Sequence, residues 1–257
     1  MSKIHNTAII SKNVIIDAEV EIGAYSVIGE NVKIGKGTKI KSHVIIEGDT
    51  TIGEGNIIYS FAAIGTDPQD LKYAGEDTKV IIGNNNKIRE YVTINKGTIA
   101  SGKTIVGNDN LLMAYSHIAH DCIVGSHCIL ANAATLGGHA EIDDWAIIGG
   151  LTGIHQFVKI GAHVMVGGGS ALKQDVMPYV IVDGNDAKVR GINSIGLQRR
   201  GFTKEELQNI KKAYKIIFRS KLKMDDALEK LKDEFAEDEK VKLFIEFAEK
   251  SERGVYR

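Results

Sequence analysis

Aliphatic residues recur every six positions through the first two thirds of the chain. Stepping by six from Ile4, the sequence has Ile at every step to Ile64, again from Ile82, and Ile, Leu or Val from Val106 to Leu172. Of the 29 positions in this series, 26 are Ile, Leu or Val. A period of six matches neither an amphipathic helix nor an alternating strand, so it indicates a short strand and a turn that repeat.

The residues beside each aliphatic position describe the repeat. Gly follows many of them, as at Gly23, Gly35, Gly107 and Gly125, which suggests a turn that needs positive φ. Two places before the aliphatic residue, the side chain is usually small or β-branched. With one hexad on each of three flat faces, a coil takes 18 residues and its aliphatic side chains stack on the next coil along the axis. The pattern predicts an all-β solenoid of roughly ten coils, about 45 Å long.

The period breaks at two places. Asp70 and Glu76 occupy positions where the series requires an aliphatic residue, and a charge directed at the axis would cost roughly several kcal/mol. We therefore expect residues 65–79 to loop outward and residues 97–103 to form a second, smaller loop. Loops that leave a rigid scaffold often carry binding groups.

The hexads stop near Pro178, and a helical pattern begins after Arg200. Thr203 and Glu206 form a capping-box signature, and apolar residues follow it at helical spacing. Further helices are expected over residues 224–235 and 239–250. The sequence thus predicts two domains, a parallel β-helix over residues 1–190 and a helical domain over residues 191–257.

Charge and composition exclude several classes of protein. The chain has 32 Lys and Arg against 33 Asp and Glu, so no overall charge favours binding to nucleic acid or to anionic membranes. No apolar run approaches the ~20 residues of a membrane-spanning helix, and the N-terminus has no signal-peptide pattern. Cys122 and Cys128 fit neither a disulfide framework nor a paired zinc motif. We expect a cytoplasmic protein without membrane insertion.

The charge of the helical domain is uneven. Residues 199–223 contain nine Lys or Arg and two Glu, a net charge of +7, whereas residues 224–252 have a net charge of −6. One interpretation is a pair of solvated helix faces. The other is a docking patch for an acidic partner.

Polar side chains gather in residues 115–122, and the 18-residue coil predicts their neighbours. One column of the prism should contain His120, Gly138 and Gln156, and the adjacent column Asp121 and His139. Because glycine has no side chain, His120 and Gln156 would face a recess lined by polar groups. A histidine followed by an aspartate suggests a general base held by a carboxylate.

Two other interpretations of these histidines stay open. His117, His120 and His139 could together bind zinc, as in hexad proteins that hydrate carbon dioxide, although their spacing is weak evidence. The solenoid could also be a scaffold without catalytic activity. No G-x-S-x-G motif supplies a nucleophile, and the two cysteines are expected to be buried and inert.

Several longer strings resemble a known family. Residues 117–122 (HIAHDC), 154–157 (IHQF), 163–168 (HVMVGG) and 199–202 (RRGF), together with the hexads, are similar to the UDP-N-acetylglucosamine O-acyltransferases of the hexapeptide-repeat superfamily. The resemblance covers essentially the whole chain. It implies a left-handed parallel β-helix with a C-terminal helical domain, assembled as a homotrimer with active sites between subunits.

The resemblance also implies an activity. An (R)-3-hydroxyacyl group would pass from acyl carrier protein to the 3-position of UDP-N-acetylglucosamine, the first step of lipid A biosynthesis. His120 would be the general base, Asp121 would hold it, and the backbone N–H of Gly138 would stabilise the oxyanion. Attack on the thioester would be direct. No cofactor would be bound to the enzyme, because the acyl group arrives on the phosphopantetheine of the carrier protein.

Further residues follow from the same resemblance. The residues that would hold the nucleotide sugar are His117, His139, Gln156, Asn193, Arg199, Arg200, Asp70 and Lys72. The acyl chain would be measured by a pocket at His155, Met165 and Gly168. Ile195 stands where well-known relatives have Glu, and Asp186 where they have His. The residues leave open whether the acceptor is a 3-hydroxyl or a 3-amino group.

Overall fold

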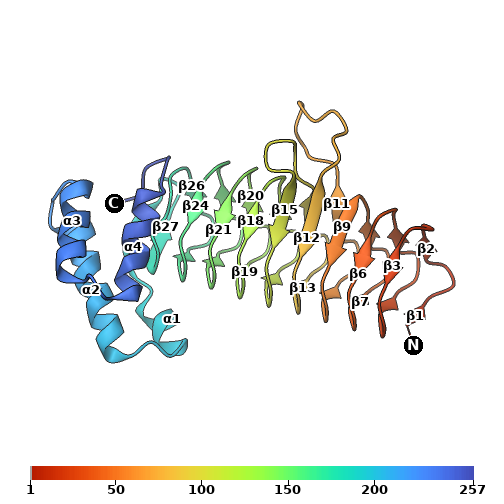
Figure 1. Ribbon diagram of the computed structural model, residues 1–257, viewed down its shortest axis with the longest axis horizontal. Helices are drawn as coiled ribbons and strands as arrows, with labels where there is room; N and C mark the ends of the chain where they lie inside the picture. Colours follow the sequence, from red (N-terminus) through yellow and green to blue (C-terminus); the bar gives the residue numbers. More distant parts are fainter. Residues whose placement is uncertain (1) are drawn as a thin grey trace.

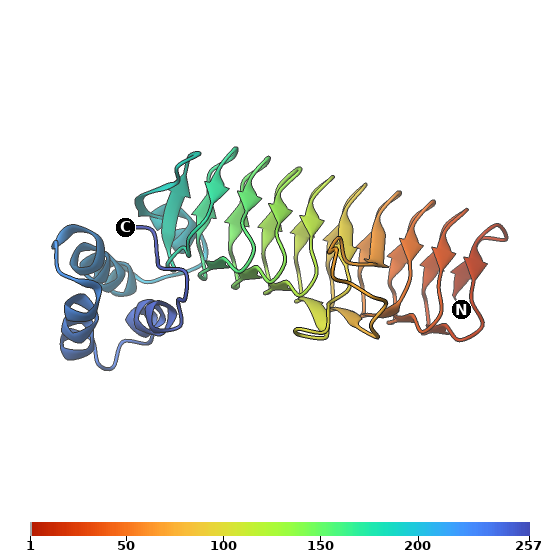
Figure 2. The ribbon, with the colours of Figure 1, turned by 90° about the horizontal axis from the view of Figure 1, so that it is seen from above.

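The protein is a long three-sided prism with a group of helices at one end (Figure 1). The computed structural model describes residues 2–257. The N-terminus lies at the end opposite the helices, and successive coils follow one another along the long axis in both views (Figures 1 and 2).

Three sheets form the faces of the prism. Sheet A contains β1 (Lys3–Ile4), β4 (Glu21–Ile22), β7 (Lys39–Ile40), β10 (Ile57–Ile58), β13 (Lys87–Ile88), β16 (Leu111–Leu112), β19 (Ile129–Leu130), β22 (Ile147–Ile148), β25 (Met165–Val166), β27 (Val180–Asp183) and β28 (Lys188–Ile192). Sheet B contains β2 (Ile9–Ile10), β5 (Val27–Ile28), β8 (Ile45–Ile46), β11 (Ala63–Thr66), β14 (Thr93–Asn95), β17 (His117–Ile118), β20 (Thr135–Leu136), β23 (Gly153–Ile154) and β26 (Ala171–Leu172). Sheet C contains β3 (Ile15–Ile16), β6 (Lys33–Ile34), β9 (Asp49–Ile52), β12 (Lys79–Ile82), β15 (Lys103–Val106), β18 (Ile123–Val124), β21 (Glu141–Ile142) and β24 (Lys159–Ile160).

The register of these sheets confirms the 18-residue coil. Up to β26, strands three places apart along the chain pair in parallel, so that His117 pairs with Thr135 and Thr135 with Gly153, whereas β25 pairs in parallel with β27. The only antiparallel pair among residues 2–257 joins β27 to β28 at the helical end. From Ile22 onward, the aliphatic residues of the hexad series are buried along the axis. Stacked side chains from neighbouring coils therefore form one continuous core.

The glycines that follow the aliphatic residues are required for a different physical reason from the one that the sequence suggested. Positive φ was expected at Gly107 and Gly125, but the left-handed conformation occurs two residues later in the turn, as at Asp109 and His127. A Cβ on Gly107 would lie 2.6 Å from the carbonyl oxygen of Gly125 in the next coil. The sequence interpretation was wrong here, because glycine is required by close approach between coils and not by its φ.

Two loops leave the prism on the same edge. Residues 67–78 connect β11 to β12, and residues 96–102, which include the loop 97–102, connect β14 to β15 (Figure 1). Both connections run from sheet B to sheet C, so the loops lie one coil apart. Asp70 and Glu76 belong to the first loop and are outside the axial core.

Four helices cover the far end of the prism. They are α1 (Ser194–Arg199), α2 (Lys204–Arg219), α3 (Met224–Glu234) and α4 (Glu239–Glu249). The capping box at Thr203 and Glu206 is present, which confirms the predicted start of α2, whereas the short helix α1 was not anticipated. The helices share a second core, which includes Phe244 and Tyr179. No helix in the described part of the chain is long and apolar enough to cross a membrane.

Candidate active site

The three edges of the prism define where each candidate residue can act. Edge BC, where sheet B turns into sheet C, carries residues 119–122, 137–140 and 155–158 in successive coils. Edge CA carries residues 125–128, 143–146 and 161–164. Edge AB carries residues 131–134, 149–152 and 167–170. The two loops leave edge BC, directly before the coil that contains His120.

His120 and Asp121 form a hydrogen-bonded pair on edge BC. His120 Nδ1 lies 2.8 Å from Asp121 Oδ2, and the side chain of Asp121 is fully buried whereas that of His120 is 15% exposed. Because an ionised carboxylate can only accept, Nδ1 carries the proton and Nε2 presents a lone pair. The imidazole is thus held in the tautomer that can take a proton from a substrate.

The carboxylate of Asp121 is surrounded by hydrogen-bond donors. Thr98 donates to it through its backbone N–H at 2.9 Å and through its hydroxyl at 2.6 Å, and the hydroxyl of Ser101 donates to Oδ1. Burial alone would raise the pKa of Asp121, but the hydrogen bonds from Ser101, Thr98 and His120 outweigh it and lower that pKa. Asp121 is therefore a buried carboxylate that stays ionised.

Gly138 lies directly under the ring of His120. A Cβ built on Gly138 would be 2.5 Å from His120 Cε1 and 2.6 Å from Nε2. The predicted column is therefore present, but the expected recess between His120 and Gln156 was wrong, because the imidazole fills the space beside Gly138 that a side chain would take. Gln156, one coil further along, is exposed.

His139 and His117 lie beside this pair. The ring of His139 meets that of His120 edge-on, stacks on Phe157 with centroids 4.4 Å apart, and places Nε2 3.6 Å from Asp121 Oδ2. His117 Nδ1 lies 2.7 Å from the hydroxyl of Thr93. Burial, and then the coulombic interaction with His120, lowers the pKa of His117, so its imidazole is neutral near pH 7.

Part of this cluster could hold a metal ion. His120, Asp121 and His139 each offer one ligand atom, and these atoms lie within 4.8 Å of one another. His117, the third histidine of the zinc interpretation, is not in that group. Each carboxylate oxygen of Asp121 already accepts two hydrogen bonds, so metal binding would have to displace one of them. The donor set fits a hydrogen-bonded base better than a metal site.

The candidate arginines lie on a different edge. Arg200 Cζ lies 5.4 Å from the ring centroid of Trp145, and Arg200 Nη1 lies 3.3 Å from His163 Nδ1, both on edge CA. Burial lowers the pKa of Arg200, but from so high a value that it keeps its charge. Arg199 is exposed at the end of α1. Asn193 is buried, and its side chain caps α1 through Gly196 N–H and donates to the carbonyl of His163.

The remaining candidates are spread further. Asp70 and Lys72 lie in the loop 67–78, and His155 is exposed on edge BC. Met165 is 40% exposed on sheet A, and Gly168 lies on edge AB. Ile195, in α1, and Asp186, in the turn between β27 and β28, are both exposed. One chain therefore brings His120, Asp121, Gly138 and His139 together, but not the arginines or Gly168.

Comparison with known proteins identifies the family to which the chain belongs. A family model described as UDP-N-acetylglucosamine O-acyltransferase, domain 2, matches residues 175–256, and a bacterial transferase hexapeptide model matches residues 31–66 and 103–138. The chain is 50% identical over 265 residues to an acyl-[acyl-carrier-protein]–UDP-N-acetylglucosamine O-acyltransferase of Herminiimonas arsenicoxydans, with both chains fully covered. It is 45% identical over 258 residues to that of Myxococcus xanthus, again over both full lengths. The chain belongs to the UDP-N-acetylglucosamine O-acyltransferase family.

Solved structures agree with this assignment. The structure of LpxA from Acinetobacter baumannii matches with a TM-score of 0.97 and 46% identity, covering 99% of each chain. The resemblance seen in the sequence is thus confirmed, and the fold is the left-handed parallel β-helix with a C-terminal helical domain that it implied.

Some residues of the site were not found from the sequence. Thr98 and Ser101 hold Asp121, and Thr104 accepts a hydrogen bond from the backbone N–H of Asp121 at 2.9 Å. The only signal was the break in the hexads at residues 97–103, which marks a loop but does not show where its side chains point. Cys122 and Cys128 are buried as expected, and burial raises the pKa of each thiol to about 12.

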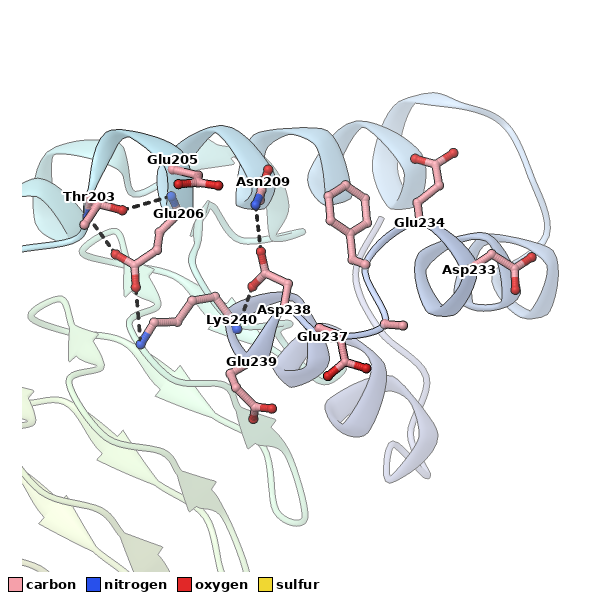
Figure 3. A pocket seen from close by; sticks show the side chains of 12 residues that line it. Thr203, Glu205, Glu206, Asn209, Asp233, Glu234, Glu237, Asp238, Glu239 and Lys240 are labelled. Carbon is pink, nitrogen blue, oxygen red and sulfur yellow. Dashed lines mark hydrogen bonds and ion pairs between the residues drawn. The ribbon is translucent and has the colours of Figure 1, made fainter.

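Two cavities differ in their relation to the pair. One of about 460 Å³ is lined by Asp121, His139, Phe157 and Arg253, and so adjoins it. The other, of about 600 Å³, lies between α2 and the start of α4 (Figure 3). Two of its acidic groups have structural partners: Glu206 closes the capping box and accepts from Lys240, and Asp238 caps α4 and accepts from Asn209. The first cavity adjoins the pair on the Asp121 side, and its lining does not include His120 or Gly138.

Replacing Gly138 tests the packing under His120. Gly138→Ala should displace the imidazole of His120, because the new Cβ would overlap the ring. The ring is the end of a flexible side chain, so it can move at a low cost in stability. We expect a crystal structure of the variant to show His120 rotated away from Asp121, with the melting temperature lowered by no more than roughly 2–4 °C, equivalent to about 1 kcal/mol in a chain of this size. An unmoved His120 would contradict this packing.

Proposed function

We propose that the protein transfers an (R)-3-hydroxyacyl group from acyl carrier protein to the 3-position of UDP-N-acetylglucosamine, the first step of lipid A biosynthesis. The observation that carries the proposal is the His120–Asp121 pair, which presents a free Nε2 over Gly138 in a chain that belongs to this family. Cytoplasmic residence is part of the proposal, because two unpaired cysteines are typical of a reducing compartment.

The mechanism uses His120 as a general base. Nε2 takes the proton of the sugar 3-hydroxyl while the hydroxyl oxygen attacks the carbonyl carbon of the thioester. The π electrons of the carbonyl move onto the carbonyl oxygen, which becomes the oxyanion. Collapse of this intermediate breaks the C–S bond, and the imidazolium returns its proton to the thiolate of the phosphopantetheine. Asp121 stabilises the imidazolium while the charge is present.

Gly138 supplies a donor for the oxyanion. Its carbonyl accepts from Phe157, but its own N–H has no acceptor among residues 2–257. Gly138 lies on the same edge as the base, one coil further along, and a Cβ on it would meet the imidazole. One such donor contributes about 2.7–4 kcal/mol to transition-state stabilisation in well-studied acyl transfer.

The distribution of residues over the edges supports a shared site. His120, His139 and Gln156 lie on edge BC, whereas Asn193 and Arg200 lie at edge CA of the same prism. A nucleotide sugar that contacts both sets needs edge CA of a second copy against edge BC of the first. We propose a homotrimer, in which cyclic symmetry gives every subunit the same pair of contacts.

Mixed oligomers test the shared site. His120→Ala and Arg200→Ala should each lose activity, and trimers assembled from both variants together should recover it at about a quarter of their sites by random assortment. The measurement is transfer by co-expressed variants carrying different affinity tags, with each variant alone as the control. Mixed trimers as inactive as either parent would place both residues of a site in one chain.

The basic segment of the helical domain suits the carrier protein. Its exposed cations form no ion pair among residues 2–257 and are Lys204, Lys211, Lys212, Lys215, Arg219, Lys221 and Lys223. Lys211, Lys215 and Arg219 follow one another at four-residue spacing on α2 and therefore share a face. Acyl carrier proteins are acidic, so we assign this face to donor docking.

Charge reversal tests the docking face. Lys211→Glu with Lys215→Glu should raise KM for the acyl carrier protein roughly tenfold or more and weaken its salt dependence, because the long-range attraction is lost. Turnover of a small acyl-pantetheine thioester should not change. Lys230→Glu, which reverses an exposed lysine on α3, is the control and should leave both rates near wild type. Equal losses with both donors would refute donor docking here.

Removal of the base tests the reaction itself. His120→Ala should lower kcat by roughly 10²–10⁴, since that is the usual contribution of a positioned general base. Product formation is followed by mass spectrometry with UDP-N-acetylglucosamine, its 3-amino analogue and hydroxyacyl carriers of several chain lengths. His43→Ala, in the N-terminal coils, is the control histidine and should keep the wild-type rate.

The outcomes separate the open alternatives. A near wild-type rate in His120→Ala would end the general-base assignment. Faster reaction of the 3-amino sugar would make nitrogen the acceptor. Turnover that requires stoichiometric zinc and stops with a chelator would favour a metal site at His120, Asp121 and His139.

A further inference from the structure

The loop of residues 97–102 contributes three hydrogen bonds to one buried carboxylate. Thr98 donates twice to Asp121, from its backbone N–H to Oδ1 at 2.9 Å and from its hydroxyl to Oδ2 at 2.6 Å. The hydroxyl of Ser101 also donates to Oδ1. Thr98 is 8% exposed and Asp121 4% exposed, so water does not easily replace the two Thr98 donors, whereas Ser101 is exposed.

These bonds fix the orientation of the carboxylate. A carboxylate has about four acceptor positions, and Asp121 uses two on each oxygen, counting the bond from His120 Nδ1. Because Thr98 donates a hydrogen bond to each oxygen, the carboxylate plane cannot rotate without breaking one of these hydrogen bonds. The one acceptor position left for an imidazole then points at His120.

The loop itself is held rigidly. The N–H of Gly102 donates to the carbonyl of Thr98 at 2.8 Å, and the hydroxyl of Thr78 donates to the carbonyl of Gly97 at 2.6 Å. A Cβ on Gly97 would overlap the backbone of Lys103, so this glycine lets the loop close against the next strand. The N–H of Ala100 donates to the hydroxyl oxygen of Thr98 at 3.3 Å, which leaves the hydroxyl proton for Asp121.

We propose that Thr98, assisted by Ser101, is a positioning residue of the acyl transfer: it sets the orientation and the ionisation of Asp121 and through it the alignment of His120. The inference rests on the proposed function, because it assumes that His120 is the base. Neither residue reaches the reacting atoms, and their effect passes through the carboxylate. The hexad break at residues 97–103 would then be a functional insertion.

The electrostatics of the pair agree with this role. Burial would raise the pKa of Asp121, and the hydrogen bonds from Ser101 and Thr98, with that from His120, are what lower it. The titratable groups that face the carboxylate are His120 and His139, and the cavity beside it is also lined by Glu141, Lys159, Glu252 and Arg253. Without the loop donors, burial would prevail, and Asp121 would take up a proton at higher pH.

Substitutions at Thr98 test the proposal. Thr98→Val keeps the shape and the backbone donor but removes the hydroxyl, and we expect kcat to fall roughly 10–100-fold with KM for both substrates within about twofold of wild type. The deficit should widen as the pH falls, because protonated Asp121 no longer accepts from His120. Thr98→Ser restores the hydroxyl and should restore most of kcat. Ser101→Ala should give a smaller loss in the same direction.

The matched control is Thr38→Val. Thr38 is, like Thr98, a buried threonine, and its hydroxyl donates to the carbonyl of Gly53 in the next coil, far from His120 along the chain. Its loss should leave kcat and the pH profile unchanged. Thr98→Val with kcat within twofold of wild type, a pH-independent deficit, or no rescue by Thr98→Ser would each overturn the proposal.

A substrate-free readout separates this inference from the proposed function. The proton on His120 Nδ1 should give a downfield NMR signal, assigned by its absence in His120→Ala. Thr98→Val should shift this signal upfield or broaden it, and Thr98→Ser and Thr38→Val should retain it. Inactive wild-type protein with the expected spectral changes would refute the proposed reaction alone. An unchanged signal in Thr98→Val would refute the positioning role even in an active enzyme.

Discussion

The parallel hydrogen-bond ladder between coils is the constraint on which the rest of the structure depends. It holds each residue above the one 18 places later, as His117 over Thr135, so every coil inherits the axial position and orientation of the coil before it. A single change of coil length would send aliphatic side chains outward and charges inward. Extra residues are therefore tolerated only where they leave the prism, as both loops do at edge BC. Because the ladder is rigid, an edge of the prism can hold two reactive side chains at hydrogen-bond distance from each other.

Much of this architecture could be predicted because the constraint is periodic. Ile or Leu at six-residue spacing shows both the strands and the axial core, and the neighbours of His120 follow by adding 18. The interpretation failed where one sequence feature has two physical causes. A glycine after an aliphatic residue is compatible both with a left-handed turn and with close contact between coils. The close approach of Gly107 to Gly125 shows that contact is the reason for glycine here.

The site was predictable to the extent that it obeys the repeat. His120, Asp121 and Gly138 lie in adjacent columns, so their contacts follow from residue numbers alone. Thr98 and Ser101 come from a segment where the period is lost, and no spacing rule places their hydroxyl groups. Arg200 reaches Trp145 only after the chain has reversed through β28 and α1, a path fixed by long-range packing. Predictability thus ends where the chain leaves the ladder.

The same geometry bears on why a base is favoured over a metal here. Three ligand atoms lie close enough for an ion, yet the carboxylate among them is already saturated by Thr98, Ser101 and His120. A metal ion would compete with the imidazole for Oδ2 and would leave donors of the buried Thr98 without their acceptor, at a cost of about 1–3 kcal/mol for each unsatisfied group. A hydroxyl-bearing acceptor substrate requires no such change, because it meets only Nε2. The loop of residues 97–102 therefore favours a general base over a metal site, because its donors occupy the acceptor positions of Asp121.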